Sequence, residues 1–276
     1  MRGSEEDAVL ERSHWLCVKS ECNPRLNEDA VLQRHAADLR MAMLAFQIWC
    51  PKGWNGIIVN TACTEAGILT VRNVCLPEPY AVTRWANLLR VDNLCVDQLR
   101  ILIDGTFSAL ESDSIASRNP IQYLEIGLQT AVNHTKAGAL LWMIGLDSLL
   151  AAQGEALFAA RLCRLLGNDT RIFPEDYRGR RPVYTVGEVA SDIYQLRNQV
   201  AHGDRIRAKY LTKREFQFDP PKLHYLRIGE WSYQSLLCEA GLFALCAALR
   251  KVILDGHLKI LNQPRIWKRW LDEGLV

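Results

Sequence analysis

The sequence predicts a mainly α protein, in which a C-terminal helical bundle follows a small α+β module. Two observations lead to this fold class. Short β-branched segments separated by Pro, Gly and Asn occur only before residue 118, and apolar residues at helical spacing dominate after it. Ser117 to Pro120 supplies a helix N-cap and a first-turn proline at this point. We therefore expect two domains, 1–118 and 119–276.

The N-terminal module is expected to contain a few strands and a helix. The strand-like segments cover 45–50, 56–60 and 67–74, and turn residues separate them. A helical pattern takes over from Tyr80 to Ile103. These patterns assign no separate activity to the module.

The helices expected in the C-terminal bundle follow from runs of apolar residues at helical spacing. They cover 121–136, 138–152, 155–166, 186–202 and 230–255, with a short helix after Pro264. The first two alternatively form one long helix kinked at Gly138. In the last long helix, apolar side chains between Trp231 and Leu249 provide surface for the bundle core.

The helix expected at 186–202 has both ends marked. Thr185 and Glu188 have the spacing of a capping box, in which the side chain of each residue bonds to the backbone N–H of the other. Gly203 is the residue type that ends a helix in a left-handed C-terminal cap. We therefore expect this helix to begin and end sharply.

The same helix carries polar side chains outside its apolar stripe. The stripe consists of Val189, Ile193, Leu196 and Val200. At about 100° per residue, Arg197, Asn198 and His202 lie outside this stripe, and His202 points nearly opposite to it. A permanent cation, an amide and an imidazole that titrates near neutral pH thus share the solvent side of the helix end. This combination is typical of a site that handles a phosphodiester.

Composition limits the classes of protein to which the chain can belong. With 276 residues, of which 49% are hydrophobic and 23% charged, the chain is typical of a globular protein. Its nine cysteines form no Cys-x-x-Cys pair and have no histidine at zinc-ligand spacing, so we expect neither a disulfide framework nor a metal site. Nucleotide-binding and hydrolase motifs are missing from the sequence, and no cofactor is expected.

Two further features bear on the location of the protein. Residues 1–7 are polar and acidic, and no apolar core follows them, which argues against a secretory signal. The longest apolar stretch, about 137–152, is interrupted by Asp147 and is shorter than the ~20 residues that span a membrane. We therefore expect a cytoplasmic protein without a membrane partner.

The formal net charge of +2 excludes a uniformly basic surface, but the charge is unevenly distributed. Residues 171–214 contain ten basic and five acidic residues. This excess flanks the 186–202 helix, where it would attract a phosphate backbone. We expect Arg205 and Arg207, directly after the helix, to bind substrate phosphates.

The polar end of the 186–202 helix carries a family resemblance. Arg197, Asn198 and His202 stand as Arg-Asn-x-x-x-His, which resembles the R-x4-6-H signature of the HEPN superfamily. This resemblance implies a helical domain that forms a homodimer through the motif helix. It also implies that these three residues are the catalytic residues of an RNA-cleaving site.

Two earlier segments are similar to the Apea-like branch of that superfamily. Leu140 to Leu150 resembles the apolar helix of the branch that contains an acidic residue, which is Asp147 here where Glu is common. Gly154 to Gly167 resembles the helix that follows. The similar region runs from about Pro120 to Gly256, and the resemblance also indicates a defence or toxin activity against phage.

The expected reaction is cleavage of RNA without a metal ion. Neutral His202 would take the proton from a ribose 2′-OH, while Arg197 would stabilise charge on the phosphate and Asn198 would orient it. The products would be a 2′,3′-cyclic phosphate and a 5′-hydroxyl, so DNA would not be a substrate. Asp147 and Tyr194 are accessory candidates, Tyr194 by stacking on a base.

Other interpretations of the motif stay open at this point. Arg197 and His202 are about 140° apart around the helix, so two copies of the chain would have to meet at one phosphodiester for catalysis. HEPN-like proteins include members that bind RNA or a protein partner without cleaving anything. Alternatively, Arg197 and His202 contact each other within one chain and only stabilise the helix end.

Overall fold

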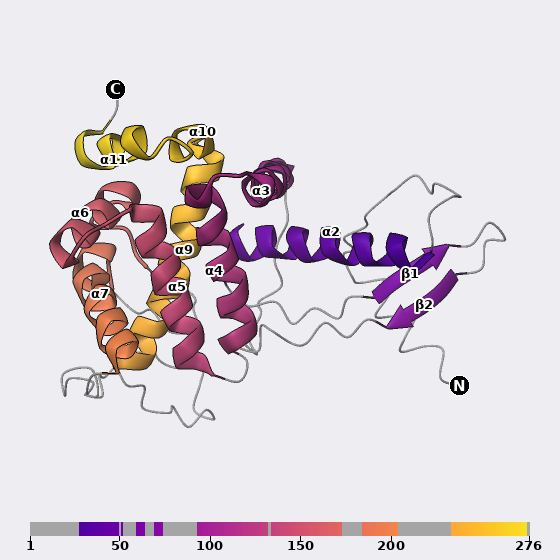
Figure 1. Cartoon of the computed structure of the whole chain (residues 1–276), viewed down its shortest axis with the longest axis horizontal. Coiled ribbons are helices and arrows are strands. Elements are labelled where there is room, and N and C mark those ends of the chain that lie inside the picture. The colour runs from indigo at the N-terminus through magenta and orange to yellow at the C-terminus, as the bar shows by residue number, and fades with distance from the viewer. Residues whose placement is uncertain are drawn as a thin grey trace, which may run out of the picture. The chain divides into compact units, whose positions relative to one another are not determined.

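The structure is a computed structural model, and its described part is mostly helical, as the fold class predicted (Figure 1). The described residues are 28–49, 51, 59–63, 69–73, 93–131, 134–172, 184–203 and 233–274. The chain divides into two compact units, Met1–Met43 and Leu44–Val276. The second unit contains the bundle.

The second unit begins within a helix and continues with a strand pair. Helix α2 spans Glu28–Trp49, so its last turns belong to this unit. Strands β1 (Val59–Cys63) and β2 (Leu69–Asn73) pair antiparallel. The other described elements are α3 (Asn93–Glu111), α4 (Ile115–Ala131), α5 (Thr135–Leu150), α6 (Glu155–Leu166), α7 (Val186–His202), α9 (Tyr233–Leu254), α10 (Leu258–Leu261) and α11 (Pro264–Glu273).

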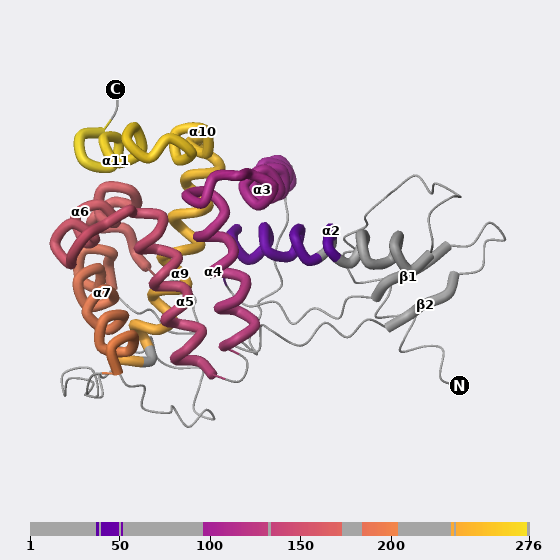
Figure 2. Tube along the Cα trace, in the orientation of Figure 1, coloured from indigo at the N-terminus to yellow at the C-terminus, as the bar shows by residue number. Residues whose placement is uncertain are grey.

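Helix α5 is the central element of the bundle. It packs along α4 and α9 and also contacts α6 and α7, and Figure 2 shows the traces of α4, α5 and α9 side by side. Trp142, Met143, Leu146 and Leu149 of α5 are each at most 2% exposed.

No single helix in the described part of the chain is long and apolar enough to cross a membrane, although α5 and α6 pass that test as a pair bent by 79°.

Helices α4 and α5 approach each other closely through glycine. A Cβ atom added to Gly127 would overlap the indole nitrogen of Trp142 and lie 3.0 Å from the carbonyl oxygen of Gly138. A Cβ atom on Gly138 would lie 2.6 Å from the carbonyl oxygen of Gly127. Since glycine has no side chain at either position, the two backbones can come together and the large Trp142 ring fits between the helices.

Most of the helices expected in the bundle are observed close to their predicted bounds. Helices α6 and α7 begin and end within one residue of the prediction, α9 within three residues, and α11 begins at Pro264 as predicted. Helices α4 and α5 are separate, with the break before Thr135 rather than a kink at Gly138. The short helix α10 was not predicted.

The predicted strand at 45–50 is wrong, because residues 45–49 belong to helix α2. Leu44, Ala45 and Ile48 are all buried, and their spacing places them on one face of a helix. That face packs into the core, which outweighs the β preference of the short segment. Strand β2 lies within the strand predicted at 67–74, and β1 overlaps the strand predicted at 56–60. The expected helix at 80–103 is described only from Asn93.

The start predicted for the first bundle helix is also wrong. Helix α4 begins at Ile115, so Pro120 lies inside it. The backbone N–H of Arg118 already donates to Ser114 O at 3.1 Å, and the helix is therefore established before the proline. Pro120 costs α4 the one hydrogen bond that its own nitrogen would donate.

The hydrophobic core continues across the predicted domain boundary at residue 118. Leu102 and Ala109 of α3 belong to the same buried cluster as Ile121 of α4 and Leu146 of α5. Helices α3 and α4 also contact each other and α9. Residue 118 thus lies within the second compact unit, and the contacts divide the chain at Met43 instead.

Gly127→Ala tests the close contact between α4 and α5. We expect the free energy of unfolding to fall by about 1–3 kcal/mol, because the methyl group would force Trp142 and the backbone of α5 to move. Gly241→Ala is the matched control, since its methyl group would meet only the flexible side chain of Met143, at 3.2 Å. Urea denaturation measures both, and equal stability of the Gly127→Ala protein and the wild type would contradict the packing.

Glu239 of α9 predicts a pH dependence of stability. This side chain is buried, and burial raises the pKa of its carboxyl from 4.5 to about 8. Between these pH values the folded state holds a proton that the unfolded state releases, so stability falls as pH rises and levels off above about pH 8. The expected loss is on the order of 1 kcal/mol per pH unit. The stability of Glu239→Gln, measured by denaturation across this range, should not fall in this way. Equal pH dependence of stability in the variant and the wild type would refute the prediction.

Candidate functional site

Helix α7 has both of the ends that the sequence predicted. Glu188 accepts a hydrogen bond from the backbone N–H of Thr185 at 2.8 Å, as a capping box requires. Gly203 adopts a φ of 67°, and its N–H donates to Val200 O at 3.3 Å. A residue other than glycine is strained at this φ, because its Cβ atom would crowd the backbone. The glycine thus ends α7 directly after His202.

The buried face of α7 agrees with the predicted stripe except in the last turn. Val189, Ile193 and Leu196 are each at most 1% exposed. Val200 is only half-buried, and the neighbouring Gln199 is buried in its place. The buried side of α7 therefore includes Gln199 in the last turn.

The guanidinium of Arg197 is held by three neighbouring groups. Its Nη2 forms an ion pair with Oδ2 of Asp147 on α5 at 2.9 Å, and its Nη1 donates to Oδ1 of Asn198 at 2.7 Å. The ring of Tyr194, one turn earlier, lies below the guanidinium carbon with its centroid 5.6 Å away. The structure thus brings together four of the residues that the sequence singled out, three from α7 and one from α5.

The ion pair is partly shielded from water. The side chain of Arg197 is 25% exposed and that of Asp147 is 20% exposed. Burial raises the pKa of the Asp147 carboxyl, and the positive charge of Arg197 opposes this shift. Oδ1 of Asp147 and Nε of Arg197 are buried and have no hydrogen-bond partner among the described residues. The pair therefore keeps an acceptor and a donor that a water molecule could satisfy.

The side chain of Tyr194 packs against two other side chains of the same chain. Its ring packs on Phe158 of α6, with the ring centroids 5.3 Å apart. Together with the guanidinium of Arg197, this contact leaves the side chain half-buried. Stacking of Tyr194 on a base stays a prediction, whereas support of Arg197 is what the observed contacts provide.

His202 stands apart from this cluster, five residues after Arg197. It is exposed, and it forms no hydrogen bond with any described residue. The hydrogen bonds of Arg197 go to Asp147 and Asn198, so they do not tie it to His202 within one chain. Arg205 and Arg207 lie outside the described residues.

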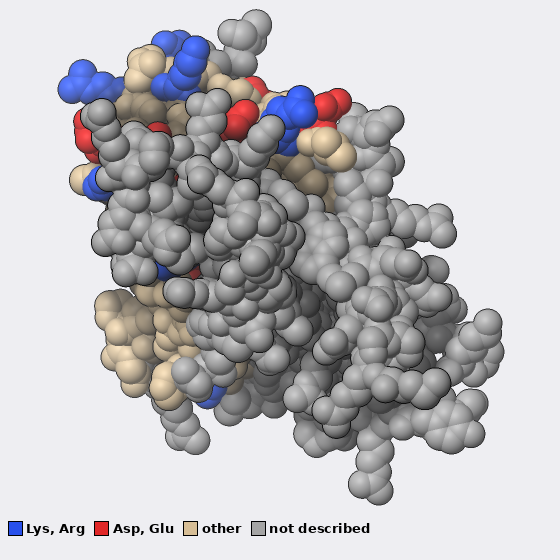
Figure 3. Space-filling model, turned by 90° about the vertical axis from the view of Figure 1, so that its right-hand side faces the viewer, with Lys and Arg blue, Asp and Glu red and all other residues tan. Residues whose placement is uncertain are grey.

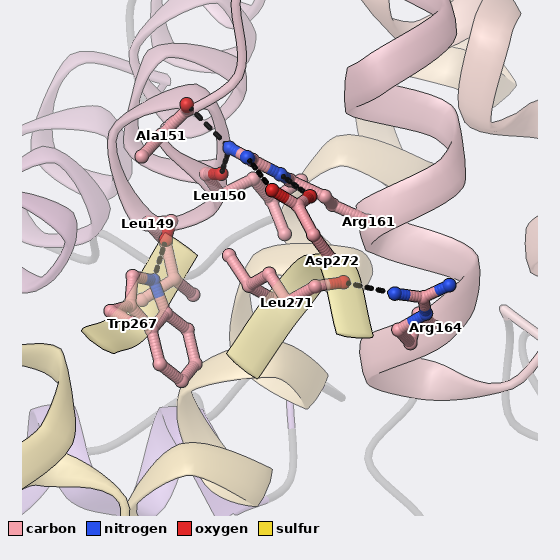
Figure 4. A network of polar contacts seen from close by, with 8 residues as sticks. All are labelled: Leu149, Leu150, Ala151, Arg161, Arg164, Trp267, Leu271 and Asp272. Atoms are coloured by element: carbon pink, nitrogen blue, oxygen red, sulfur yellow. Dashed lines mark hydrogen bonds and ion pairs between the residues drawn. The ribbon is translucent and has the colours of Figure 1, made fainter. Parts of the chain in front are cut away.

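Sequence reasoning missed a second arginine near the same end of α5. Arg161 of α6 is buried, donates to the carbonyl oxygens of Leu150 and Ala151, and forms two bonds of 2.7 Å to Asp272 of α11 (Figure 4). It thereby satisfies carbonyls that the end of α5 leaves free. A basic residue within an apolar helix stripe is the signal that could have predicted an acidic partner.

Comparisons with known proteins provide no relative for this chain. No protein-family model, no curated protein and no solved structure matches it. Within the described residues, no group of three or more His, Cys, Asp and Glu side chains is arranged to hold a metal ion. The local geometry described above is therefore the basis for a functional proposal.

A double-mutant cycle tests whether Asp147 and Arg197 stabilise each other. We expect Asp147→Ala and Arg197→Ala to be coupled by about 1 kcal/mol in the free energy of unfolding, because each single change leaves a partly buried charge without its partner. His202→Ala is the comparison, and its exposed side chain should change stability by less than about 0.5 kcal/mol. Urea denaturation measures the four proteins of the cycle and His202→Ala, and a coupling near zero would contradict the ion pair.

Proposed function

We propose that this chain is a metal-independent endoribonuclease of the HEPN superfamily, with a composite Arg/His site formed by two copies. The observation that carries the proposal is the guanidinium of Arg197, held by Asp147, with an exposed His202 five residues later at the end of the same helix. Asp147 and Tyr194 hold the cation in place before any substrate arrives. A cation positioned in advance stabilises a developing phosphate charge without reorganising during the reaction.

The remaining donors of Arg197 suit a phosphate group. A guanidinium has five N–H donors, and Asp147 and Asn198 each take one of them. Further N–H groups on the two η nitrogens stay available for phosphate oxygens. Asn198 accepts from Arg197 through Oδ1, so its amide nitrogen is the atom that would donate to the substrate.

Two copies of the chain would complete the site. Arg197 and His202 point in directions about 140° apart around α7, so one helix does not direct both at the same phosphorus. A two-fold axis near the C-terminal end of α7 would bring both pairs to one phosphodiester. The exposed last turn of α7, which includes Ala201, His202 and Gly203, is the surface through which the copies would meet.

The proposed reaction uses one histidine from each copy. Neutral His202 of one copy takes the proton of the ribose 2′-OH, and the 2′ oxygen forms a bond to the adjacent phosphorus. The bond from phosphorus to the 5′ oxygen breaks, and the protonated His202 of the second copy donates a proton to this leaving oxygen. Arg197 neutralises the charge that grows on the phosphate oxygens. The products are a 2′,3′-cyclic phosphate and a 5′-hydroxyl.

One observation favours a second candidate, a HEPN-type module that binds RNA or a protein without cleavage. Among the described residues, none orients the imidazole of His202 by a hydrogen bond. A general base usually has such a partner to select its tautomer. In the proposed nuclease, the second copy or the substrate would have to supply it. A cytoplasmic defence or toxin role belongs to the same proposal.

Cleavage of labelled single-stranded RNA and of its all-deoxy counterpart in EDTA tests the proposed function. We expect the wild type to cut RNA only, and His202→Ala to lose at least about 100-fold in rate, as removal of a general base does. His134→Ala is the matched control, because His134 is also exposed but lies at the start of α5. Cleavage of DNA, inhibition by EDTA, or equal rates for the two histidine variants would refute the nuclease.

A further inference from the structure

Helix α11 presents one fixed face to the outside of the bundle. Its apolar side chains Trp267 and Leu271 are each 1% exposed. The indole nitrogen of Trp267 donates to Leu149 O at 2.6 Å, and Arg164 of α6 donates to Leu271 O at 3.0 Å. Together with the ion pair between Arg161 and Asp272, these bonds attach α11 to the ends of α5 and α6 (Figure 4).

The outward side of α10 and α11 is basic. We use the name α10–α11 basic face for Lys259, Arg265, Lys268 and Arg269. All four are exposed. Figure 3 shows Lys and Arg side chains at the top of the view, with Asp and Glu side chains next to them, at the height of the elements that Figure 1 labels α10 and α11.

Both acidic residues of α11 form ion pairs, and the charge of Asp272 also interacts with that of Lys268. Both carboxylate oxygens of Asp272 bond to Arg161, and Glu273 pairs with Arg269 at 2.8 Å. Lys259, Arg265 and Lys268 form no ion pair with a described residue. Three exposed cations therefore remain for an external anion.

The packing of α11 favours a nucleic acid over a membrane as that anion. A basic amphipathic helix binds anionic lipid by inserting its apolar face into the bilayer. In α11 this face is covered, because Trp267 is buried and its ring stacks on Trp270 with the centroids 5.0 Å apart. Ile266, at 41% exposed, is the large apolar side chain of α11 that stays open. Separated cations without an insertable apolar face suit a phosphodiester backbone.

We propose that the α10–α11 basic face binds the sugar-phosphate backbone of RNA, as a docking site distinct from Arg197 and His202. The choice of RNA rests on the proposed function, whereas the charge pattern itself would accept any phosphodiester strand. Lysine and arginine side chains on an exposed helix read phosphate charge and not base identity. The site would therefore increase affinity without adding sequence preference, and RNA and DNA of equal length would bind it alike.

The test measures binding of fluorescently labelled single-stranded RNA over a range of salt concentrations. His202→Ala is the background, so that cleavage does not disturb the equilibrium. We expect Arg265→Gln combined with Lys268→Gln to raise the Kd about fivefold or more at 0.1 M salt. The slope of log Kd against log salt should fall by about 1.4, because each phosphate contact with a single strand contributes about 0.7.

The matched control removes two exposed basic residues outside the face, with Arg100→Gln on α3 and Lys136→Gln at the start of α5. Its affinity and salt slope should stay near those of the background protein. Equal affinities of the two double variants would overturn the docking site. So would charge-dependent binding to vesicles containing phosphatidylserine in the absence of RNA binding.

Failure of the docking site and failure of the nuclease give different results. If the wild type does not cut RNA but Arg265→Gln with Lys268→Gln weakens RNA binding as expected, the docking site stands and the nuclease fails. If the wild type cuts RNA and the double variant binds and cuts as well as the wild type, the nuclease stands and the docking site is refuted.

Discussion

Burial of α5 is the constraint on which the rest of the bundle depends. A helix that is apolar on nearly every side has to be covered by neighbours, and α4, α7 and α9 provide this cover. The close approach of α4 requires glycine at Gly127 and Gly138. Asp147 is the acidic residue of α5, and at this depth it needs a cation beside it. Arg197 supplies that cation, so the position of the candidate site follows from the packing of α5.

The C-terminal end of α5 organises two surfaces of the molecule. Asp147 holds Arg197 there, and Leu149, two residues later, accepts the hydrogen bond that attaches α11 through Trp267. Asp147 bonds through its side chain, whereas Leu149 bonds through its backbone carbonyl oxygen. Arg161 stabilises the turn after α5 by binding its free carbonyls. The proposed catalytic and docking surfaces are thus attached to one rigid helix end.

Local signals in the sequence predicted the motif helix well and the N-terminal elements poorly. The capping box at Thr185 and the glycine at Gly203 act within a few residues, so the bounds of α7 could be derived without knowing its neighbours. The segment at 45–50 resembles a strand locally, but its apolar residues are buried on one face of α2. Pro120 similarly suggested a helix start, although preceding residues had already begun α4. At 45–50, longer-range packing outweighed the short pattern, whereas at Pro120 the helix hydrogen bonds begin before the proline.

The order of residues along α7 alone put Arg197, Asn198 and His202 at one helix end, because a regular helix converts spacing into direction. The partners of those residues depended on tertiary structure. Asp147 is fifty residues from Arg197 in the chain, and Asp272 is 111 residues from Arg161. No local pattern relates such distant residues, since an ion pair forms only after the helices have packed and excluded water from both charges. Packing therefore decided which arginine is anchored, and it left His202 exposed.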